Sequence, residues 1–175
     1  PNPLADGSTL LRRIHLTITG LPPTPKILQQ FHHLPTEKHQ AWLDKEIVRL
    51  LNSKQYGEHW GRYWLDIARW AESNGHQHNR YRPDAWRYRD YVIDSFASNK
   101  PYDQFVREQI AGDEIAPDQP DHVIATGFLR MGPWEHTSMT VAAVTRQQYL
   151  DDVVNAVGVS FLGTELRCAK CHDHK

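Results

Sequence analysis

The chain has 175 residues, of which 39% are hydrophobic and 23% are charged, and its 20 basic and 21 acidic side chains leave a formal net charge of -1. A chain of this length is expected to form one domain over residues 1–175 with a core of its own. The even charge balance, without any basic block, excludes the electrostatic footprint of a nucleic-acid-binding protein. No apolar run approaches the roughly 20 residues that a membrane-spanning helix needs.

The N-terminal part of the chain predicts one extended segment followed by two helices. Residues 14–18 alternate between apolar and polar side chains before a Gly-Leu-Pro-Pro turn, which predicts a short strand or an extended arm. Thr24 followed by proline is typical of a helix N-cap and first turn, and predicts a helix to about His33. The next helix is expected from Thr36 to about Asn52, because its apolar residues recur at spacings of three and four.

The rest of the chain predicts five more helices joined by short turns that proline or glycine marks. The expected helices cover residues 56–73, 83–99, 101–112, 122–132 and 145–161. Gly163 stands where a C-terminal cap is expected after the last of them. The fold class is therefore predicted as mostly α, an irregular domain of about six to seven helices with little or no sheet.

The two ends of the chain suggest a piece of a longer protein. It begins with proline instead of an initiator methionine, and its first residues lack the charged and apolar regions of a signal peptide. It ends three residues after His172. The chain is therefore expected to be a fragment of a longer protein, and the lack of a signal peptide in it says nothing about whether the parent protein is exported.

The only two cysteines of the chain, Cys168 and Cys171, are followed directly by His172. This C-x-x-C-H spacing is the sequence of c-type haem attachment. Two thiols on one helical turn can each bond one vinyl group of a haem, and the adjacent imidazole can bind the iron. The motif predicts Cys168 and Cys171 as covalent attachment points and His172 as the axial ligand.

Other uses of the same residues stay open at this stage. Zinc or another transition metal would need four ligands in a structural site, so histidines or carboxylates would have to complete the pair of cysteines. A redox-active C-x-x-C is expected near a βαβ pattern, which this chain lacks. A disulfide between the two cysteines would close a very small loop and stabilise little.

The second axial ligand of a haem is not fixed by the spacing of the motif. The candidates are Met131, Met139, His136 and His174. Methionine and histidine both serve as axial ligands in cytochromes. An open sixth position is equally compatible, and would indicate ligand binding or catalysis instead of electron transfer alone.

A second group of polar and aromatic residues in the middle of the chain predicts a possible pocket. Arginines there could hold haem propionates or an anionic substrate such as an acidic sugar, since a guanidinium matches a carboxylate with two parallel hydrogen bonds. The alternative is a network of ion pairs between neighbouring helix positions. The candidate residues are Asp66, Arg69, Asn74, His76, Trp86, Arg87, Arg89 and Trp134.

An ordered series of motifs along nearly the whole chain resembles a known family. The series is HLTITGLPPTP from His15, YGEHWGRYWLDIARWAESNG from Tyr56, AWRYRDYVIDSF from Ala85, KPYDQFVREQIAGDE from Lys100, ATGFLRMGPW from Ala125 and CAKCHDHK from Cys168. It resembles the planctomycete-type cytochrome-like domain, a family of unknown function found in large exported bacterial proteins.

The resemblance implies a periplasmic or extracellular location and a place before a further domain, and it matches the C-x-x-C-H element of the family. The resulting hypothesis is an exported haem c module that transfers electrons within a larger redox protein. Its partner would be an electron donor or acceptor protein, or an adjacent domain of the same chain. The alternatives are a haem enzyme with an open coordination site, and a non-haem metal-binding or carbohydrate- or anion-binding module of a larger secreted protein.

Overall fold

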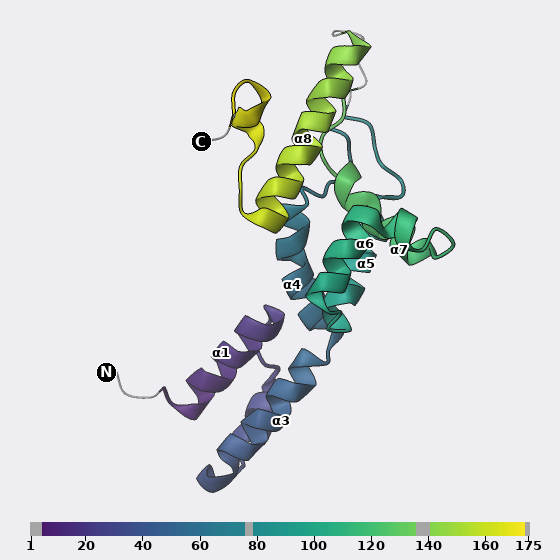
Figure 1. Cartoon of the computed structure of the whole chain (residues 1–175). Helices are drawn as coiled ribbons and strands as arrows, with labels where there is room; N and C mark the ends of the chain where they lie inside the picture. Colours follow the sequence, from purple (N-terminus) through teal and green to yellow (C-terminus); the bar gives the residue numbers. More distant parts are fainter. Residues whose placement is uncertain (1–4, 76–78, 136–140, 174–175) are drawn as a thin grey trace. The chain divides into compact units, whose positions relative to one another are not determined.

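The structure is a computed structural model that describes residues 5–75, 79–135 and 141–173. These described residues form eight α-helices and three short 3-10 helices (Figure 1), and their β-type pairing is limited to an isolated bridge between Ser73 and Tyr81. The elements are α1 (Gly7–Thr19), α2 (Pro25–His32), η1 (Thr36–Lys38), α3 (His39–Leu51), α4 (Lys54–Ile67), α5 (Ala85–Ala97), α6 (Tyr102–Ile115), α7 (Pro120–Ala125), η2 (Thr126–Arg130), α8 (Ala142–Leu162) and η3 (Arg167–Lys170). The predicted mostly α fold class is confirmed.

Helix α1 corrects the prediction of a strand or extended arm at residues 14–18. Asp6 caps the helix by accepting a hydrogen bond from the backbone nitrogen of Thr9 at 3.0 Å. The buried side chains of α1 are Leu11, His15 and Thr19, which are four residues apart. The short apolar alternation was therefore part of a helical pattern that begins earlier, and the N-cap at Asp6 carried the decisive signal.

The boundaries of the other helices agree with the predictions in part, and α4 ends at Ile67, six residues before its predicted end. Thr24 caps α2 as predicted, by accepting a hydrogen bond from the backbone nitrogen of Ile27. Helix α6 continues three residues past the predicted end at Gly112, across a non-helical residue, Ala111. Helix α8 begins at Ala142, three residues earlier than predicted, and Gly163 caps its end in the left-handed conformation as expected.

The described chain divides into two compact units, the first from residues 1–62 and 93–99 and the second from residues 63–92 and 100–175. The core of the first unit contains Leu11, Phe31 and Leu43. Helices α1 and α3 are also joined by a buried polar contact, because the His15 ring lies 3.0 Å from a carboxylate oxygen of Glu46. This histidine is 4% exposed, so the contact is shielded from solvent.

The core of the second unit is organised around a buried hydrogen-bond network. The indole nitrogen of Trp64 donates to Gln109 Oε1 at 2.8 Å, and the Tyr88 hydroxyl donates to the same oxygen at 2.6 Å. Burial raises the pKa of Tyr88 well above its ordinary value, so this hydroxyl stays protonated as a donor. Since Trp64, Tyr88 and Gln109 belong to α4, α5 and α6, the network fixes three helices against one another.

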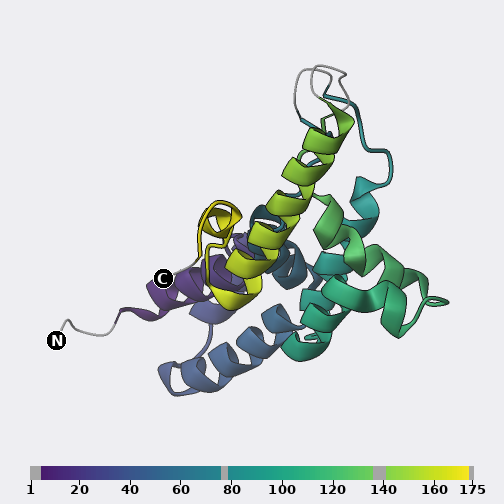
Figure 2. The same cartoon turned by 45° about the horizontal axis from the view of Figure 1, so that its top comes forward.

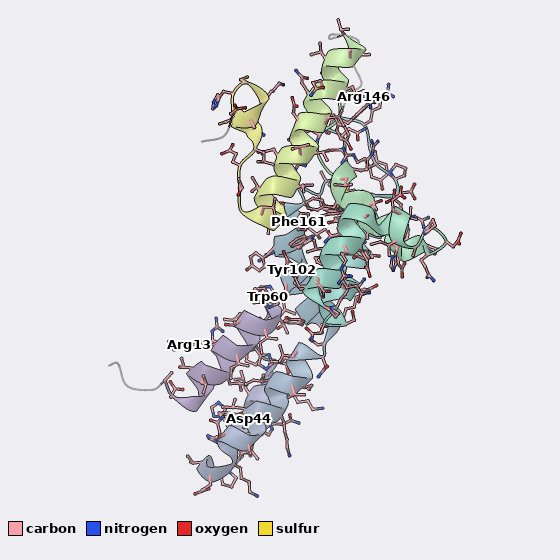
Figure 3. All side chains as sticks on the ribbon, in the orientation of Figure 1. Arg13, Asp44, Trp60, Tyr102, Arg146 and Phe161 are labelled. Carbon is pink, nitrogen blue, oxygen red and sulfur yellow. The ribbon has the colours of Figure 1, made fainter. Side chains whose placement is uncertain are left out.

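Helix α8 joins this core through its last turns. Phe161, labelled in Figure 3, lies with its ring centroid 4.9 Å from that of Phe128 and 5.8 Å from that of Trp64. Aromatic pairs at such distances add to the free energy of burial. Within the described part of the chain, none of the helices combines the length and the apolar character that crossing a membrane requires.

A buried carboxylate, Glu108, links α6 to α5 and to the chain between them. Its side chain is 2% exposed, accepts hydrogen bonds from Tyr91 at 2.8 Å and Gln104 at 2.6 Å, and forms an ion pair with Lys100. Burial by itself raises the pKa of Glu108, but the hydrogen bonds from Lys100, Tyr91 and Gln104 outweigh it and lower this pKa below the ordinary value.

We expect Glu108→Gln to lower the free energy of unfolding by about 3–5 kcal/mol, because it leaves the partly buried ammonium of Lys100 without its counter-charge. Asp103→Asn is the matched control on the same helix. It removes a carboxylate that is 67% exposed and paired with Arg107, and should cost less than about 1 kcal/mol. Urea unfolding of the three proteins measures both changes.

The difference between wild type and Glu108→Gln should also depend on pH. Because the folded state lowers the pKa of Glu108, the stability from its charge is present at neutral pH and is lost as the pH falls through that pKa. Equal losses for the two variants, or a difference that persists in acid, would contradict a stabilising buried charge.

Candidate functional site

The C-terminal segment folds back along α8 after a reversal at Gly163. This residue has φ 62, in the left-handed region that glycine adopts without a steric penalty. The backbone nitrogen of Thr164 then donates to the carbonyl oxygen of Gly158 at 3.1 Å. Figures 1 and 2 both show the yellow segment that contains η3 lying beside α8. The cysteine motif is thereby carried on a turn that packs against the helix preceding it.

Polar side chains of α8 hold this turn in place. Asn155 Oδ1 accepts hydrogen bonds from the backbone nitrogens of Leu166 at 3.0 Å and Arg167 at 3.1 Å. Lys170, which lies between the two cysteines, forms an ion pair of 2.5 Å with Asp151. The hydrogen bond from Lys170, followed by that from Gln147, lowers the pKa of Asp151 below its ordinary value. The start and the end of η3 are therefore each anchored to α8.

A third anchor comes from Asp152, which also ties α8 to the end of α4. One of its carboxylate oxygens pairs with Arg69, and the other lies 3.9 Å from the guanidinium of Arg167. Gly132 packs beside this ion pair, since a Cβ atom at that position would lie 2.7 Å from the Asp152 carboxylate. Asp152 thus connects the motif-bearing turn with two other segments of the second unit.

The two thiols of the motif are on the same short 3-10 segment and are not joined by a disulfide. Cys168 lies within η3, and Cys171 is its C-cap. Both cysteines are exposed. Because residues three apart eclipse each other in a 3-10 helix, the two side chains leave the turn in similar directions. The turn therefore presents two reduced, accessible thiols to one ligand.

His172 follows the turn with its ring exposed. Its Nδ1 lies 2.9 Å from the carbonyl oxygen of Asp173, so the Nδ1–H group donates this hydrogen bond. In a neutral imidazole the other nitrogen, Nε2, then carries the lone pair. This tautomer is the one that a histidine with a backbone hydrogen bond offers to a metal.

A groove of about 560 Å³ lies between α8 and the turn that carries the motif, beside the contacts that join them. Its walls include apolar side chains, Leu150, Val154 and Leu166, together with the ion-paired Asp151 and Lys170. Its volume falls within the range of small-molecule and cofactor sites. Ala169 and Lys170, which lie between the two cysteines, line this groove, whereas Cys168, Cys171 and His172 are not among its lining residues.

The candidates for a second axial ligand are only partly described by the structure. Met131 is 8% exposed, and its carbonyl oxygen accepts a hydrogen bond from Arg82, which places Met131 away from the groove beside η3. Met139, His136 and His174 lie outside the described residues. Among the residues that are described, no group of three or more histidine, cysteine, aspartate or glutamate side chains is arranged to hold a metal ion.

The residues of the predicted polar pocket fall into separate places. Asn74 and Trp134 both line one groove of about 390 Å³, whereas Arg69 pairs with Asp152. Asp66 is exposed near the end of α4, and His76 lies outside the described residues.

The remaining pocket candidates lie on α5 and make local contacts. Arg87 pairs with Asp84 at 3.1 Å and its guanidinium lies 5.1 Å from the ring centroid of Trp86. Arg89 pairs with Asp90 at 2.8 Å. Arg89 also lies 4.0 Å from Glu72, so both arginines make ion pairs, although of these pairs only that of Arg87 with Asp84 has the regular helix spacing of the alternative interpretation.

Two residues were not singled out from the sequence. Asn155 anchors the motif, and Arg130 lines the groove with Trp134. A faint signal for Asn155 exists, because it follows Asp151 by four residues on the same helix. Arg130 had no such signal, since its groove with Arg82 depends on segments far apart in the chain.

Comparison with known proteins identifies one match. The model of the PSCyt2 family, described as a protein of unknown function (DUF1549), matches residues 1–175. The search of curated proteins and the search of solved structures return no match.

We expect Asn155→Ala to release the motif-bearing turn from α8 without unfolding the second unit. The change removes the acceptor of two backbone hydrogen bonds, each worth about 0.5–1.5 kcal/mol. Amide hydrogen exchange at Leu166 and Arg167 should become faster by about tenfold or more. Gln147→Ala is the control, because Gln147 bonds only the exposed side of Asp151 on the same helix. Unchanged exchange in Asn155→Ala would contradict the anchoring role.

Proposed function

Because the chain belongs to the PSCyt2 family of cytochrome-like domains over its whole length, we propose that it is a c-type haem-binding module. Cys168 and Cys171 are the attachment points in this proposal, and His172 is the axial ligand of the iron. The module carries electrons within a larger exported protein. Its partner is an electron donor or acceptor, either a separate protein or an adjacent domain of the parent chain.

The observation that carries the proposal is the state of the three motif side chains. Two unlinked and exposed thiols leave one turn, and the next imidazole has its Nδ1–H group engaged with a backbone carbonyl. That hydrogen bond selects the tautomer with a free lone pair on Nε2. The same arrangement orients metal-bound histidines in general. It therefore supports His172 as a ligand on chemical grounds that are independent of the family match.

The chain's own residues have simple roles in this chemistry. Cys168 and Cys171 would hold the haem through thioether bonds, each formed by addition of a thiol S–H across one vinyl group without an oxidant or reductant. His172 would hold the iron through Nε2. When bound, the haem supplies a site that accepts and releases one electron.

The anchors on α8 give the module its stiffness. The contacts of η3 with Asn155, Asp151 and Asp152 hold the turn that carries both cysteines against α8. Leu150, Val154 and Leu166 add apolar surface to the groove beside this turn, whose lining also contains charged side chains such as Asp151 and Lys170. The second axial position is left open in this proposal.

To test the proposal, the parent chain is expressed with a signal peptide and the cytochrome c maturation machinery, and covalent haem is measured after denaturation in alkaline pyridine. We expect one haem per chain. Cys168→Ser should leave one vinyl group unreacted, whose conjugation moves the α band to longer wavelength. Cys168→Ser combined with Cys171→Ser should abolish covalent haem. Arg87→Gln is the control, because its exposed ion pair on α5 is remote from the motif.

The same preparation includes a version without the signal peptide and an elemental analysis. If the exported chain carries no covalent haem while a control cytochrome matures normally, the proposal is wrong. Stoichiometric zinc in that haem-free protein would favour the metal-binding alternative. Covalent haem in the version that stays in the cytoplasm would contradict export as a requirement.

A further inference from the structure

A second groove in the second unit contains two arginines and three aromatic residues and is not used by the haem proposal. It has a volume of about 390 Å³ and is lined by Arg82, Arg130, Tyr81, Trp134 and Tyr149. All five residues belong to the second unit. The volume lies in the range of small-ligand sites.

Arg82 is held rigidly in this groove by neutral acceptors. Its Nη1 donates to the carbonyl oxygen of Met131 at 3.0 Å, its Nη2 donates to that of Gly132 at 2.6 Å, and its Nε donates to the Asn74 side chain. These bonds use three of the five N–H groups of a guanidinium, which leaves one on each Nη. Burial, followed by the charge of Arg130, lowers the pKa of Arg82. The positive charge of Arg82 is therefore desolvated without being neutralised.

Arg130 lies on the aromatic side of the same groove. Its guanidinium carbon is 5.6 Å from the ring centroid of Trp134 and 5.4 Å from that of Tyr149. These two rings meet edge to face at 5.0 Å. Stacking on aromatic rings fixes the plane of the guanidinium while leaving its N–H edge available for a planar anion. One N–H of Arg130, on Nη1, donates to the Tyr149 hydroxyl at 3.4 Å, and this hydroxyl in turn donates to the carbonyl oxygen of Leu129.

The charges around the groove favour an anionic ligand. Among the described residues, neither Arg82 nor Arg130 has a carboxylate within ion-pair distance. Asp84 also lines the groove, but its carboxylate pairs with Arg87 at 3.1 Å. Two neighbouring guanidinium groups without a counter-charge repel each other, and a bound anion removes this repulsion.

We propose that this groove binds an acidic sugar, a single uronic acid ring held by its carboxylate. The carboxylate pairs with the edge of Arg130 and accepts a hydrogen bond from a remaining N–H of Arg82. The ring packs against Tyr81, which is 67% exposed at the groove. The ligand is therefore defined by two features, a carboxylate and a single sugar ring. The proposal does not depend on haem, because none of these residues belongs to the cysteine motif.

The test measures glucuronate and galacturonate binding to the full chain by ¹H–¹⁵N NMR, with the Trp134 indole and the Arg130 side-chain N–H signals as reporters. We expect saturable shifts of both signals with a uronate, and binding of glucose at least about tenfold weaker, because glucose lacks the charge-assisted hydrogen bonds. Arg130→Gln should weaken uronate binding about tenfold or more. Arg107→Gln, an exposed arginine paired with Asp103 on α6, should not change it.

The other outcomes overturn the proposal in distinct ways. Equal binding of glucose and glucuronate, or unchanged binding in the folded Arg130→Gln protein, would remove the role of the carboxylate. Equal or tighter binding of benzoate or inorganic sulfate would show that the groove selects another anion and not a sugar. The double cysteine-to-serine variant should bind uronate as wild type does. If it does not, the groove and the motif are one site, and the inference of an independent site is wrong.

Discussion

The second unit depends on the ion pair between Arg69 and Asp152, which joins the end of α4 to the middle of α8. Arg69 adopts a left-handed conformation with φ 59, which costs a residue other than glycine about 1–2 kcal/mol. This conformation ends α4 and directs the guanidinium to Asp152. Gly132 packs beside the pair, and a Cβ atom at this position would lie 2.7 Å from the Asp152 carboxylate, so a larger residue would make the ion pair shift. The backbone strain at Arg69 is offset in part by this partly buried ion pair.

Each of the two grooves described above is linked to this ion pair by one further interaction. On one side, Asp152 reaches Arg167 and so supports the turn with Cys168 and Cys171. On the other side, the carbonyl oxygen of Gly132 accepts a hydrogen bond from Arg82, which holds this guanidinium in the arginine-rich groove. The two grooves are therefore both linked to this ion pair, but their chemistry differs: one lies beside the turn that carries the cysteines, and the other contains guanidinium groups and aromatic rings.

The sequence predicted the helices well where a cap marked their ends and poorly where partners are distant. Thr24 and Gly163 indicated helix boundaries correctly because capping depends on local chemistry. Helix α1 was missed because three alternating apolar residues suggested a strand, and the cap at Asp6 was not used in the prediction. The C-x-x-C-H motif is likewise a local signal. Its setting is not, because Arg69 and Asp152 are 83 positions apart and Arg82 meets the carbonyl of Gly132 across 50. No periodicity within one helix encodes such pairings.

The anchors of the cysteine turn, in contrast, are all close in the chain. Asn155 accepts from residues 11 and 12 positions ahead of it, after a reversal that Gly163 achieves with its backbone alone. Contacts with such short sequence separation close quickly and need little loss of chain entropy. Helix α8 and its returning turn therefore form a local folding unit. We therefore infer that the surroundings of the cysteines can form before distant segments of the domain assemble.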